Sequence, residues 1–418
     1  MSELFDCVVV GGGPAGSTTA TLVAEAGFRT LLLERERMPR FHVGESLMPE
    51  TYWTLQRLGL LDEMRRRPFP PKVGVQFVSG DGRESAPFFF DQHDPRECSQ
   101  TWHVERADFD HMLFQNAGAK GADCRDGVRV LDVQFQAGLP ATVVLQSEGG
   151  VTQQVQARVV VDATGQQAIL ANRLGLRESN ERLKKASIWT YYAGAERTED
   201  PRRNTTVILH TNDKSAWFWY IPLSNDIVSV GVVSDYDYLL KGRGKPAEVF
   251  AEELTKCDAV QQRIARATRR GTFHVAKEFS YTTRQHAGDG WVLVGDAFGF
   301  IDPVYSSGVF LALKSGELAA DAIVEGLQKN DLSARQLNSW TEDFKVGMTW
   351  MRKLVHAFYT NEFSFGQFMK LFPDHRGHLT DLLIGRVFHD TAGDIFQDLD
   401  PVLEQAIAAA SATEGRAD

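Results

Sequence analysis

Cysteine is scarce in this sequence of 418 residues, and its four cysteines form no recognisable pattern. Cys7, Cys98, Cys124 and Cys257 are far apart, and no two of them make a Cys-x-x-Cys pair. Zinc sites and disulfide scaffolds both depend on characteristic cysteine spacings. The sequence therefore predicts no metal site and no disulfide framework, and it favours a reducing, cytoplasmic setting.

Long hydrophobic runs and an excess of positive charge are also missing. The longest apolar runs, such as 216–221 and 309–313, are far shorter than the roughly 20 residues that cross a bilayer. Residues 1–6 contain no basic segment of the kind that begins a signal peptide. The 45 Lys and Arg residues against 55 Asp and Glu residues give a net charge of −10, which disfavours binding to nucleic acid phosphates. We expect no membrane span, no export signal and no nucleic acid partner.

The first 34 residues carry the strongest motif in the sequence. A β-prone run at 5–10 leads into Gly11-Gly-Gly-Pro-Ala-Gly16, and an Ala- and Thr-rich segment with helical spacing follows. A second strand at 31–33 ends at Glu34. Glycines at this spacing allow a tight turn and a close approach of the backbone to a pyrophosphate, and the acid can accept hydrogen bonds from a ribose. The motif predicts a dinucleotide-binding unit but does not distinguish FAD from NAD(P).

Two later segments favour FAD. A strand at 157–162 ends in Ala163-Thr-Gly165, and a strand at 290–294 ends in Gly295-Asp-Ala297. Small residues permit close approach to the dinucleotide, and Asp296 can hold ribityl or ribose hydroxyl groups. These spacings resemble the FAD-binding fold of flavoproteins of the para-hydroxybenzoate hydroxylase type. No second Gly-x-Gly-x-x-Gly follows a strand, so we expect no separate NADPH domain.

The sequence pattern changes outside the cofactor segments. The β-prone runs lie at 73–90, 187–193, 205–210, 216–222 and 227–234, and helical spacing follows from residue 333. We predict an α/β fold with a doubly wound, Rossmann-like FAD-binding domain, an antiparallel-sheet substrate domain and a helical C-terminal region. The FAD-binding domain is predicted to comprise residues 1–71, 103–186 and 275–330. The substrate domain is predicted to comprise residues 72–102 and 187–274, and the helical region residues 331–418.

Three further features of the sequence resemble motifs of the flavin-dependent halogenases. Residues 217–222 have the form Trp-x-Trp-x-Ile-Pro, residues 298–308 have the form Phe-x4-Pro-x2-Ser-x-Gly, and Lys72 stands directly before a predicted strand. Together with His42-Val-Gly-Glu-Ser46, they are most similar to the branch that acts on pyrroles and phenols, which are often tethered to a carrier protein. The resemblance extends from about residue 3 to about residue 330.

The resemblance implies an enzyme that uses FADH2, O2 and chloride or bromide. A separate flavin reductase would supply the reduced cofactor, and hypohalous acid would form at the flavin. Lys72 would then direct it to a small aromatic substrate, since a lysine can hydrogen-bond hypohalous acid as an ammonium or trap it as a haloamine. Trp217 and Trp219 alternate along a strand and so share one face, where the family pair is thought to keep substrate away from the flavin.

The resemblance also assigns roles to individual residues. Catalytic roles fall on Lys72, Trp217, Trp219 and Ser306. The residues expected to bind FAD are Gly11, Gly13, Ala15, Gly16, Glu34, Arg40, Ser46, Arg106, Asp296, Pro303 and Gly308. Helix-start amides at Ser306, Ser307 and Gly308 would hold the halide. In the tryptophan-halogenase branch a glutamate precedes the serine of this segment, whereas here Tyr305 does, which disfavours a free indole substrate.

Three other functions stay open on the sequence alone. A flavin hydroxylase that takes electrons directly from NAD(P)H shares every FAD motif but has no need for Lys72. A prenyl-chain reductase shares the same motifs but would want a more apolar cavity than this sequence shows. An FAD-binding partner without catalytic activity would also carry the FAD motifs.

Overall fold

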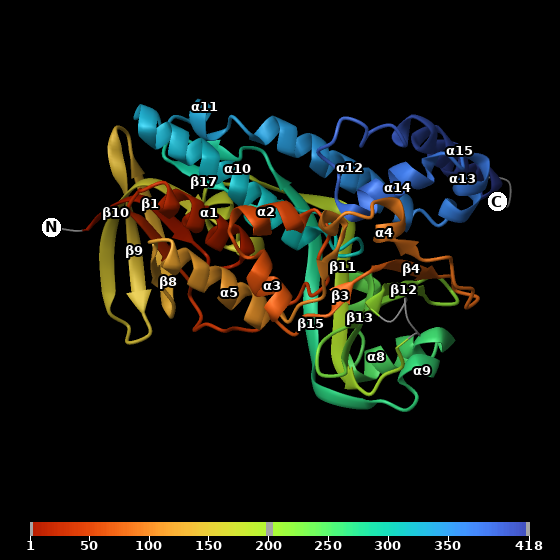
Figure 1. Ribbon diagram of the computed structural model, residues 1–418. Helices are drawn as coiled ribbons and strands as arrows, with labels where there is room; N and C mark the ends of the chain where they lie inside the picture. The colour runs from red at the N-terminus through yellow and green to blue at the C-terminus, as the bar shows by residue number, and fades with distance from the viewer. Residues whose placement is uncertain (1–2, 198–203, 415–418) are drawn as a thin grey trace.

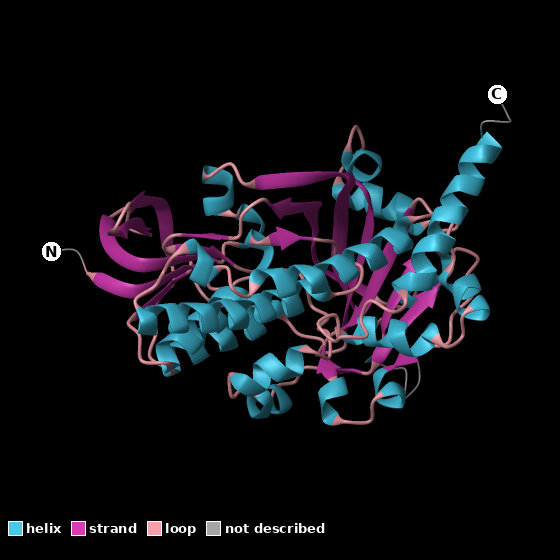
Figure 2. Cartoon of the chain, turned by 90° about the horizontal axis from the view of Figure 1, so that it is seen from above, coloured by secondary structure: helices cyan, strands magenta, loops and turns pink. Residues whose placement is uncertain are grey.

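The computed structural model describes residues 3–197 and 204–414, which form two large sheets, a small two-stranded sheet and a layer of helices (Figure 1). One sheet lies toward the N-terminal end in Figure 1 and the other toward the C-terminal helices, which run along one side of the molecule. Figure 2 shows the helices lying across strands of both sheets. The arrangement confirms the predicted mixed α/β fold with a parallel sheet, an antiparallel sheet and C-terminal helices.

The first sheet is built on buried, β-branched strands. Its strand β1 (Leu4–Val10) pairs in parallel with β2 (Thr30–Leu33) and β10 (Thr152–Asp162). Side chains of β1 and β10 such as Val8, Val9 and Val160 are buried, as expected of a parallel sheet covered on both faces. The remaining strands of this sheet are β7 (Asp123–Arg125), β8 (Val128–Gln136), β9 (Leu139–Ser147), β16 (Ala287–Gly288) and β17 (Trp291–Leu293).

Two helices pack against each other beside the parallel strands. α1 (Pro14–Glu25) follows β1, and α10 (Ser307–Lys329) packs against it. A Cβ at Gly316 would lie 2.5 Å from the carbonyl oxygen of Ala15, so this glycine permits the close approach of the two helices. α5 (Arg106–Ala119) packs on α1. The beginnings of all three helices therefore converge on one region.

The second sheet is mainly antiparallel and has the strand order β18, β15, β11, β14, β13, β12, β4, β5. Its strands are β4 (Gly74–Val78), β5 (Phe88–Phe89), β11 (Arg177–Ala193), β12 (Thr206–His210), β13 (Ala216–Pro222), β14 (Ile227–Asp235), β15 (Thr268–Thr283) and β18 (Gly299–Phe300). One pair differs from the predicted antiparallel arrangement, because β4 pairs in parallel with β12. The chain between them passes through the first sheet, and such a long connection permits parallel pairing.

A separate two-stranded sheet holds Lys72. β3 (Pro71–Lys72) pairs antiparallel with β6 (Thr101–Trp102), and Lys72 faces Thr101 across the pair. Lys72 therefore lies outside both large sheets.

The remaining short helices are α2 (Thr51–Arg57), α3 (Leu61–Arg66), α4 (Phe90–His93), α6 (Ile169–Arg173), α7 (Tyr236–Leu240), α8 (Pro246–Leu254) and α9 (Asp258–Ile264).

The C-terminal region is helical, as predicted. It consists of α11 (Ala334–Leu337), α12 (Thr341–Tyr359), α13 (Phe365–Leu371), α14 (His375–Ile384) and α15 (Phe396–Glu414). Aromatic side chains join α12 to the rest of the molecule: the rings of Phe344 and Phe298 are 5.0 Å apart, and those of Phe344 and Phe388 are 5.6 Å apart. These contacts fix the first turn of α12, whereas its last turn packs on the second sheet through Phe358, whose ring lies 5.9 Å from that of Trp217.

Candidate functional site

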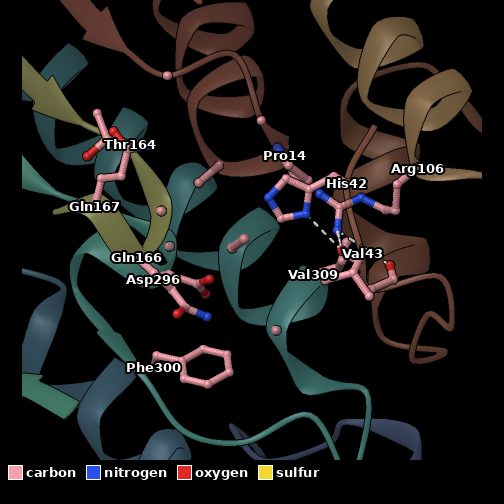
Figure 3. Close-up of a pocket in the computed structure, with 18 of the residues that line it drawn as sticks. Pro14, His42, Val43, Arg106, Thr164, Gln166, Gln167, Asp296, Phe300 and Val309 are labelled. Carbon is pink, nitrogen blue, oxygen red and sulfur yellow. Dashed lines mark hydrogen bonds between the residues drawn. The ribbon is translucent and has the colours of Figure 1, made fainter. Parts of the chain in front are cut away.

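A cavity of about 710 Å³ lies between the two sheets, at the carboxyl ends of β1 and β10. Its size falls within the roughly 300–1,000 Å³ typical of ligand and cofactor pockets. Figure 3 shows Pro14, His42 and Arg106 on one side of it, with Thr164, Asp296 and Phe300 on the other. This is the position in which open α/β sheets bind their ligands.

The glycine loop forms one wall of the cavity. Gly11 has a φ of +111°, and a Cβ there would lie 2.2 Å from the carbonyl oxygen of Ala163. A Cβ at Gly16 would lie 1.9 Å from the carbonyl oxygen of Gly11, so Gly16 packs the turn without lining the cavity. A Cβ at Gly13 would meet only the end of the Arg40 side chain, at 3.4 Å. Gly13 therefore leaves open the space into which a pyrophosphate can fit.

Carboxylates and guanidinium groups organise the neighbouring wall. Glu34 accepts a hydrogen bond of 3.0 Å from the backbone N–H of Gly12, so it braces the glycine loop. Asp110 pairs with both Arg106 and Arg40 at 2.8 Å. Burial alone would raise the pKa of Asp110, but the two arginine charges hold it below its usual value. The shared carboxylate fixes Arg40 and Arg106 at the edge of the cavity.

The start of α10 forms the opposite wall. Ser306 adopts a left-handed conformation with a φ of 60°, and its own N–H donates to the carbonyl of Pro303 at 3.0 Å. The amides of Ser307 and Gly308 open the helix, where backbone N–H groups have no partner within the helix. A Cβ at Gly308 would meet no atom within 4 Å. Ser306, Gly308, Pro303 and Asp296 line the cavity, whereas Ser307 is buried behind it.

Two tryptophans of β13 close the cavity from the second sheet. Trp217 and Trp219 are buried, both line the cavity, and their rings are 6.4 Å apart. The Trp219 indole donates to Ser229 at 3.1 Å, and the Trp217 indole donates to Tyr359 at 3.1 Å. Both side chains are therefore fixed, one by the sheet and the other by α12.

The predicted lysine lies next to the cavity without lining it. Lys72 is only 1% exposed, its Nζ donates to the carbonyl of Leu47 at 2.8 Å, and it lies 5.7 Å from the ring centre of Phe90. Burial lowers the pKa of its ammonium to about 7. Within the described chain it forms no ion pair. Residues 44–47, which we call the strap, pass between Lys72 and the cavity, since Ser46 lines the cavity and Leu47 holds the lysine.

A hydrogen-bonded chain joins the strap to the lysine's small sheet. Ser46 contacts the hydroxyl of Thr206 at 2.9 Å, and the same hydroxyl contacts Nε2 of His103 at 2.8 Å. His103 follows β6 directly and is fully buried. Burial, followed by the charge of Lys72, lowers the pKa of His103 well below its usual value, so its ring is neutral. Thr206 and His103 were not predicted as site residues, because a single threonine in a strand and a histidine before a helix carry no distinctive pattern.

Of the predicted site residues, thirteen line one cavity. They are Gly11, Gly13, Ala15, Glu34, Arg40, Ser46, Arg106, Trp217, Trp219, Asp296, Pro303, Ser306 and Gly308. Gly16, Lys72 and Ser307 lie beside the cavity without lining it.

Across residues 3–197 and 204–414, no group of three or more His, Cys, Asp or Glu residues is placed to hold a metal ion. None of the helices in these two segments is both long and apolar enough to span a membrane.

Known proteins resemble this chain over nearly its whole length. Residues 5–330 match the family model described as an FAD binding domain. The 1H-pyrrole-2-carbonyl-[peptidyl-carrier protein] chlorinase of Pseudomonas fluorescens is 31% identical, over 98% of this chain and 95% of its own. The corresponding brominase of Pseudoalteromonas luteoviolacea is 32% identical, over 93% of this chain and 94% of its own.

Solved structures agree with these relatives. The flavin-dependent brominase Bmp2 superposes with a TM-score of 0.85 at 29% identity, covering 98% of this chain and all of that one. The myxobacterial chondrochloren halogenase CndH superposes with a TM-score of 0.80 at 35% identity, covering 85% of this chain and 83% of that one. The relatives named here are halogenases, and they favour that function over the hydroxylase, prenyl-reductase and non-catalytic alternatives.

Proposed function

Because this chain belongs to the flavin-dependent halogenases, we propose that it makes hypohalous acid and that Lys72 directs this reagent to an electron-rich pyrrole or phenol. The observation that carries the proposal is the burial of Lys72 beside the strap. A buried amine with its pKa lowered to about 7 is present both as ammonium and as free base near neutral pH.

The cavity fits FAD. Gly13 leaves the space that the pyrophosphate would occupy, and the first amides of α1 face that space. Glu34 and Arg40 lie where the adenosine ribose and phosphates would lie, and Arg106 and Asp296 line the remaining length of the cavity. When bound and reduced, FAD would supply the electrons with which O2 and halide become hypohalous acid.

The start of α10 is our proposed halide site. Helix-start amides are a good anion site on physical grounds, and Ser307 and Gly308 provide them. The Ser306 amide is already engaged with Pro303, so the role of Ser306 is to set the left-handed turn that presents the two amides. Chloride or bromide held here would lie at the cavity wall, next to the flavin.

Trp217 and Trp219 separate the cavity from the rest of the second sheet. Both indoles are held by hydrogen bonds, so they present a fixed aromatic wall. We infer that this wall keeps the organic substrate away from the flavin and so suppresses oxygen insertion. A small neutral molecule such as hypohalous acid would still pass within the protein.

Lys72 can act in either of two balanced ways. As an ammonium, it hydrogen-bonds the oxygen of hypohalous acid and helps that oxygen leave as water while the ring attacks the halogen. As a free amine, it forms a nitrogen–halogen bond and releases water, and the ring then takes the halogen while the nitrogen regains a proton. Both routes need one lysine close to the substrate and no competing carboxylate, which agrees with its described surroundings.

Two relatives and the position of Tyr305 support a proposal for the substrate class. Two relatives act on a pyrrole carried by a peptidyl carrier protein. Tyr305 is buried, and its hydroxyl donates to the Leu354 carbonyl at 3.4 Å, so it provides no carboxylate base near the substrate. Pyrroles and phenols have activated rings and depend less on such a base. We therefore propose an aromatic substrate of this kind, free or tethered to a carrier protein.

Turnover with defined components tests the proposed function. The chain would be incubated with a separate flavin reductase, bromide or chloride, and a panel of free and carrier-tethered pyrroles and phenols. Mass spectrometry should detect halogenated product only when reductase, O2 and halide are all present. Rapid reduction of the bound flavin by NADPH alone, with hydroxylated and no halogenated product, would contradict the proposal.

A further inference from the structure

A buried carboxyl group faces the flavin cavity without an ionic partner. Glu45 lies on the strap, lines the cavity and is only 4% exposed. No Lys, Arg or His forms an ion pair with it in the part of the chain that the structure describes. An isolated buried carboxylate is costly, so such a group is normally either paired or protonated.

Neutral hydrogen-bond donors surround Glu45 instead. The Tyr191 hydroxyl donates to its Oε1 at 2.7 Å, and the Ser229 hydroxyl bonds to the same carboxyl group. Ser229 accepts a hydrogen bond from the Trp219 indole, so its own proton remains available to Glu45. The carboxyl group is thereby linked to the tryptophan wall of the cavity and is held in one position.

The charged neighbours of Glu45 come from the start of α5. Burial raises the pKa of Glu45 to about 7, and the charge of Glu105 adds to this effect. The hydrogen bonds from Tyr191 and Ser229 and the charge of Arg106 oppose it without cancelling it. At neutral pH a substantial share of the group is therefore the carboxylic acid.

The chemistry at this cavity consumes a proton. FADH2, O2, one halide ion and one proton give FAD, water and hypohalous acid. Two electrons come from FADH2 and two from the halide, and together they reduce both oxygen atoms. The products water and hypohalous acid together contain three protons. FADH2 supplies two of them, and halide and O2 supply none. The third proton has to be delivered to the cavity, either by solvent or by an acid in its wall.

We propose that Glu45 is the catalytic acid that supplies this proton. The inference rests on the proposed function and extends it to a residue that the sequence analysis did not assign. After donation, Tyr191 and Ser229 stabilise the carboxylate until it regains a proton from solvent. Its place on the strap puts the acid at the cavity wall and leaves Lys72, on the other side, to act on hypohalous acid after it has formed.

Infrared spectroscopy of the protein without FAD tests the protonation of Glu45 independently of turnover. The parent should show a protonated carboxylic acid band that disappears as pH rises through about 7. Glu45→Gln should lack this band, while Tyr191→Phe should shift its midpoint to higher pH, because one donor that stabilises the carboxylate is lost. A band unchanged in Glu45→Gln would overturn the inference.

Release of hypohalous acid tests the catalytic role. The assay is run in a Lys72→Ala background, so that a second group titrating near pH 7 is absent, and a diffusible thioether traps the acid. Adding Glu45→Gln should lower trapped hypohalous acid roughly 10²- to 10⁴-fold, the usual effect of losing a positioned proton donor, with hydrogen peroxide in its place. FAD binding should be retained, since glutamine still accepts the hydrogen bond from Tyr191.

Glu105→Gln is the matched control. It removes a neighbouring negative charge, so yields at acidic pH should stay at the parent value while the loss of activity at high pH moves to lower pH. Equal yields and equal pH profiles for Glu45→Gln and its parent would overturn the inference and leave the proposed function intact. Absence of hypohalous acid from the parent with either halide would instead overturn the proposed function, and this inference with it.

Discussion

The hydroxyl of Tyr359, in the last turn of α12, accepts a hydrogen bond of 3.1 Å from the indole of Trp217. The same hydroxyl donates to Asp302 at 3.2 Å. Burial, followed by the charge of Asp302, raises the pKa of Tyr359 well above its usual value, so the hydroxyl stays protonated. One side chain of the C-terminal helices thus joins the tryptophan wall to the loop before α10.

Replacing Tyr359 tests this connection. Tyr359→Phe should leave the buried Trp217 indole without its acceptor and lower the free energy of unfolding by roughly 1–3 kcal/mol. Urea denaturation would measure the change. Tyr52→Phe is the control, because the Tyr52 hydroxyl makes only a 3.4 Å contact with a half-exposed glutamate. Equal stability of Tyr359→Phe and the parent would show that the hydrogen bond contributes nothing.

Substitutions at two glycines of the loop should have different effects, one on FAD binding and the other on folding. Gly13→Val should fold, because its Cβ would meet only the guanidinium end of Arg40, at 3.4 Å, but it should lose FAD and the stability that binding confers. Gly16→Ala should destabilise the fold itself, because its Cβ would collide with the Gly11 backbone.

Absorbance of bound flavin and circular dichroism distinguish the two effects. Gly118→Ala adds a methyl group in α5 with an ordinary 3.8 Å contact and should change neither signal. A fully yellow Gly13→Val protein would contradict the assigned phosphate position.

Removing Lys72 should affect halogenation alone. Lys72→Ala should bind FAD and consume reductant and O2 at nearly the parent rate, while product falls by the roughly 10²- to 10⁴-fold typical of losing a positioned proton-transfer group. Lys72→Arg should not rescue it, because a guanidinium stays protonated and cannot form a haloamine. Parallel assays of oxygen uptake and halogenated product check this. Equal product from Lys72→Ala would exclude the assigned role.

The stability of the protein should depend on Lys72 in a pH-dependent way. In the unfolded chain the lysine keeps its ordinary pKa of 10.5, whereas in the folded state it loses its proton near pH 7. Between these values the unfolded state binds more protons, so the contribution of Lys72 to stability rises with pH. Lys72→Met should therefore stabilise the protein by a few kcal/mol, to order of magnitude, below pH 7.

That gain should shrink steadily toward pH 10. Thermal or urea unfolding across this range measures it, with Lys329→Met, at an exposed lysine in the last turn of α10, as the control that should show no such trend. A pH-independent difference between Lys72→Met and the parent would mean that Lys72 keeps an ordinary pKa.

Local patterns were sufficient to predict much of the local geometry around the cavity. The spacing of Gly11, Gly13 and Gly16 has steric consequences that the structure reproduces at each position. Alternation along a strand placed Trp217 and Trp219 on one face, and β13 has the predicted bounds. These predictions worked because each depends on neighbours in the sequence.

Contacts between distant segments could not be predicted. Glu45 and Tyr191 are 146 residues apart and meet only because the strap packs on the second sheet. The parallel pairing of β4 with β12 likewise depends on a chain that passes through another sheet. The left-handed turn at Ser306 is unusual for a residue other than glycine, and nothing in the local sequence indicates it.

The buried amine of Lys72 has one further consequence, for chemical labelling. An ordinary surface lysine is almost wholly protonated at neutral pH and acylates slowly, whereas an amine with a pKa near 7 is about half free base. The enclosure that produces this reactivity also excludes reagents. A small acylating reagent should therefore modify Lys72 quickly only when the segments that bury it open locally. The extent of modification, read by mass spectrometry, would then report how often Lys72 becomes accessible.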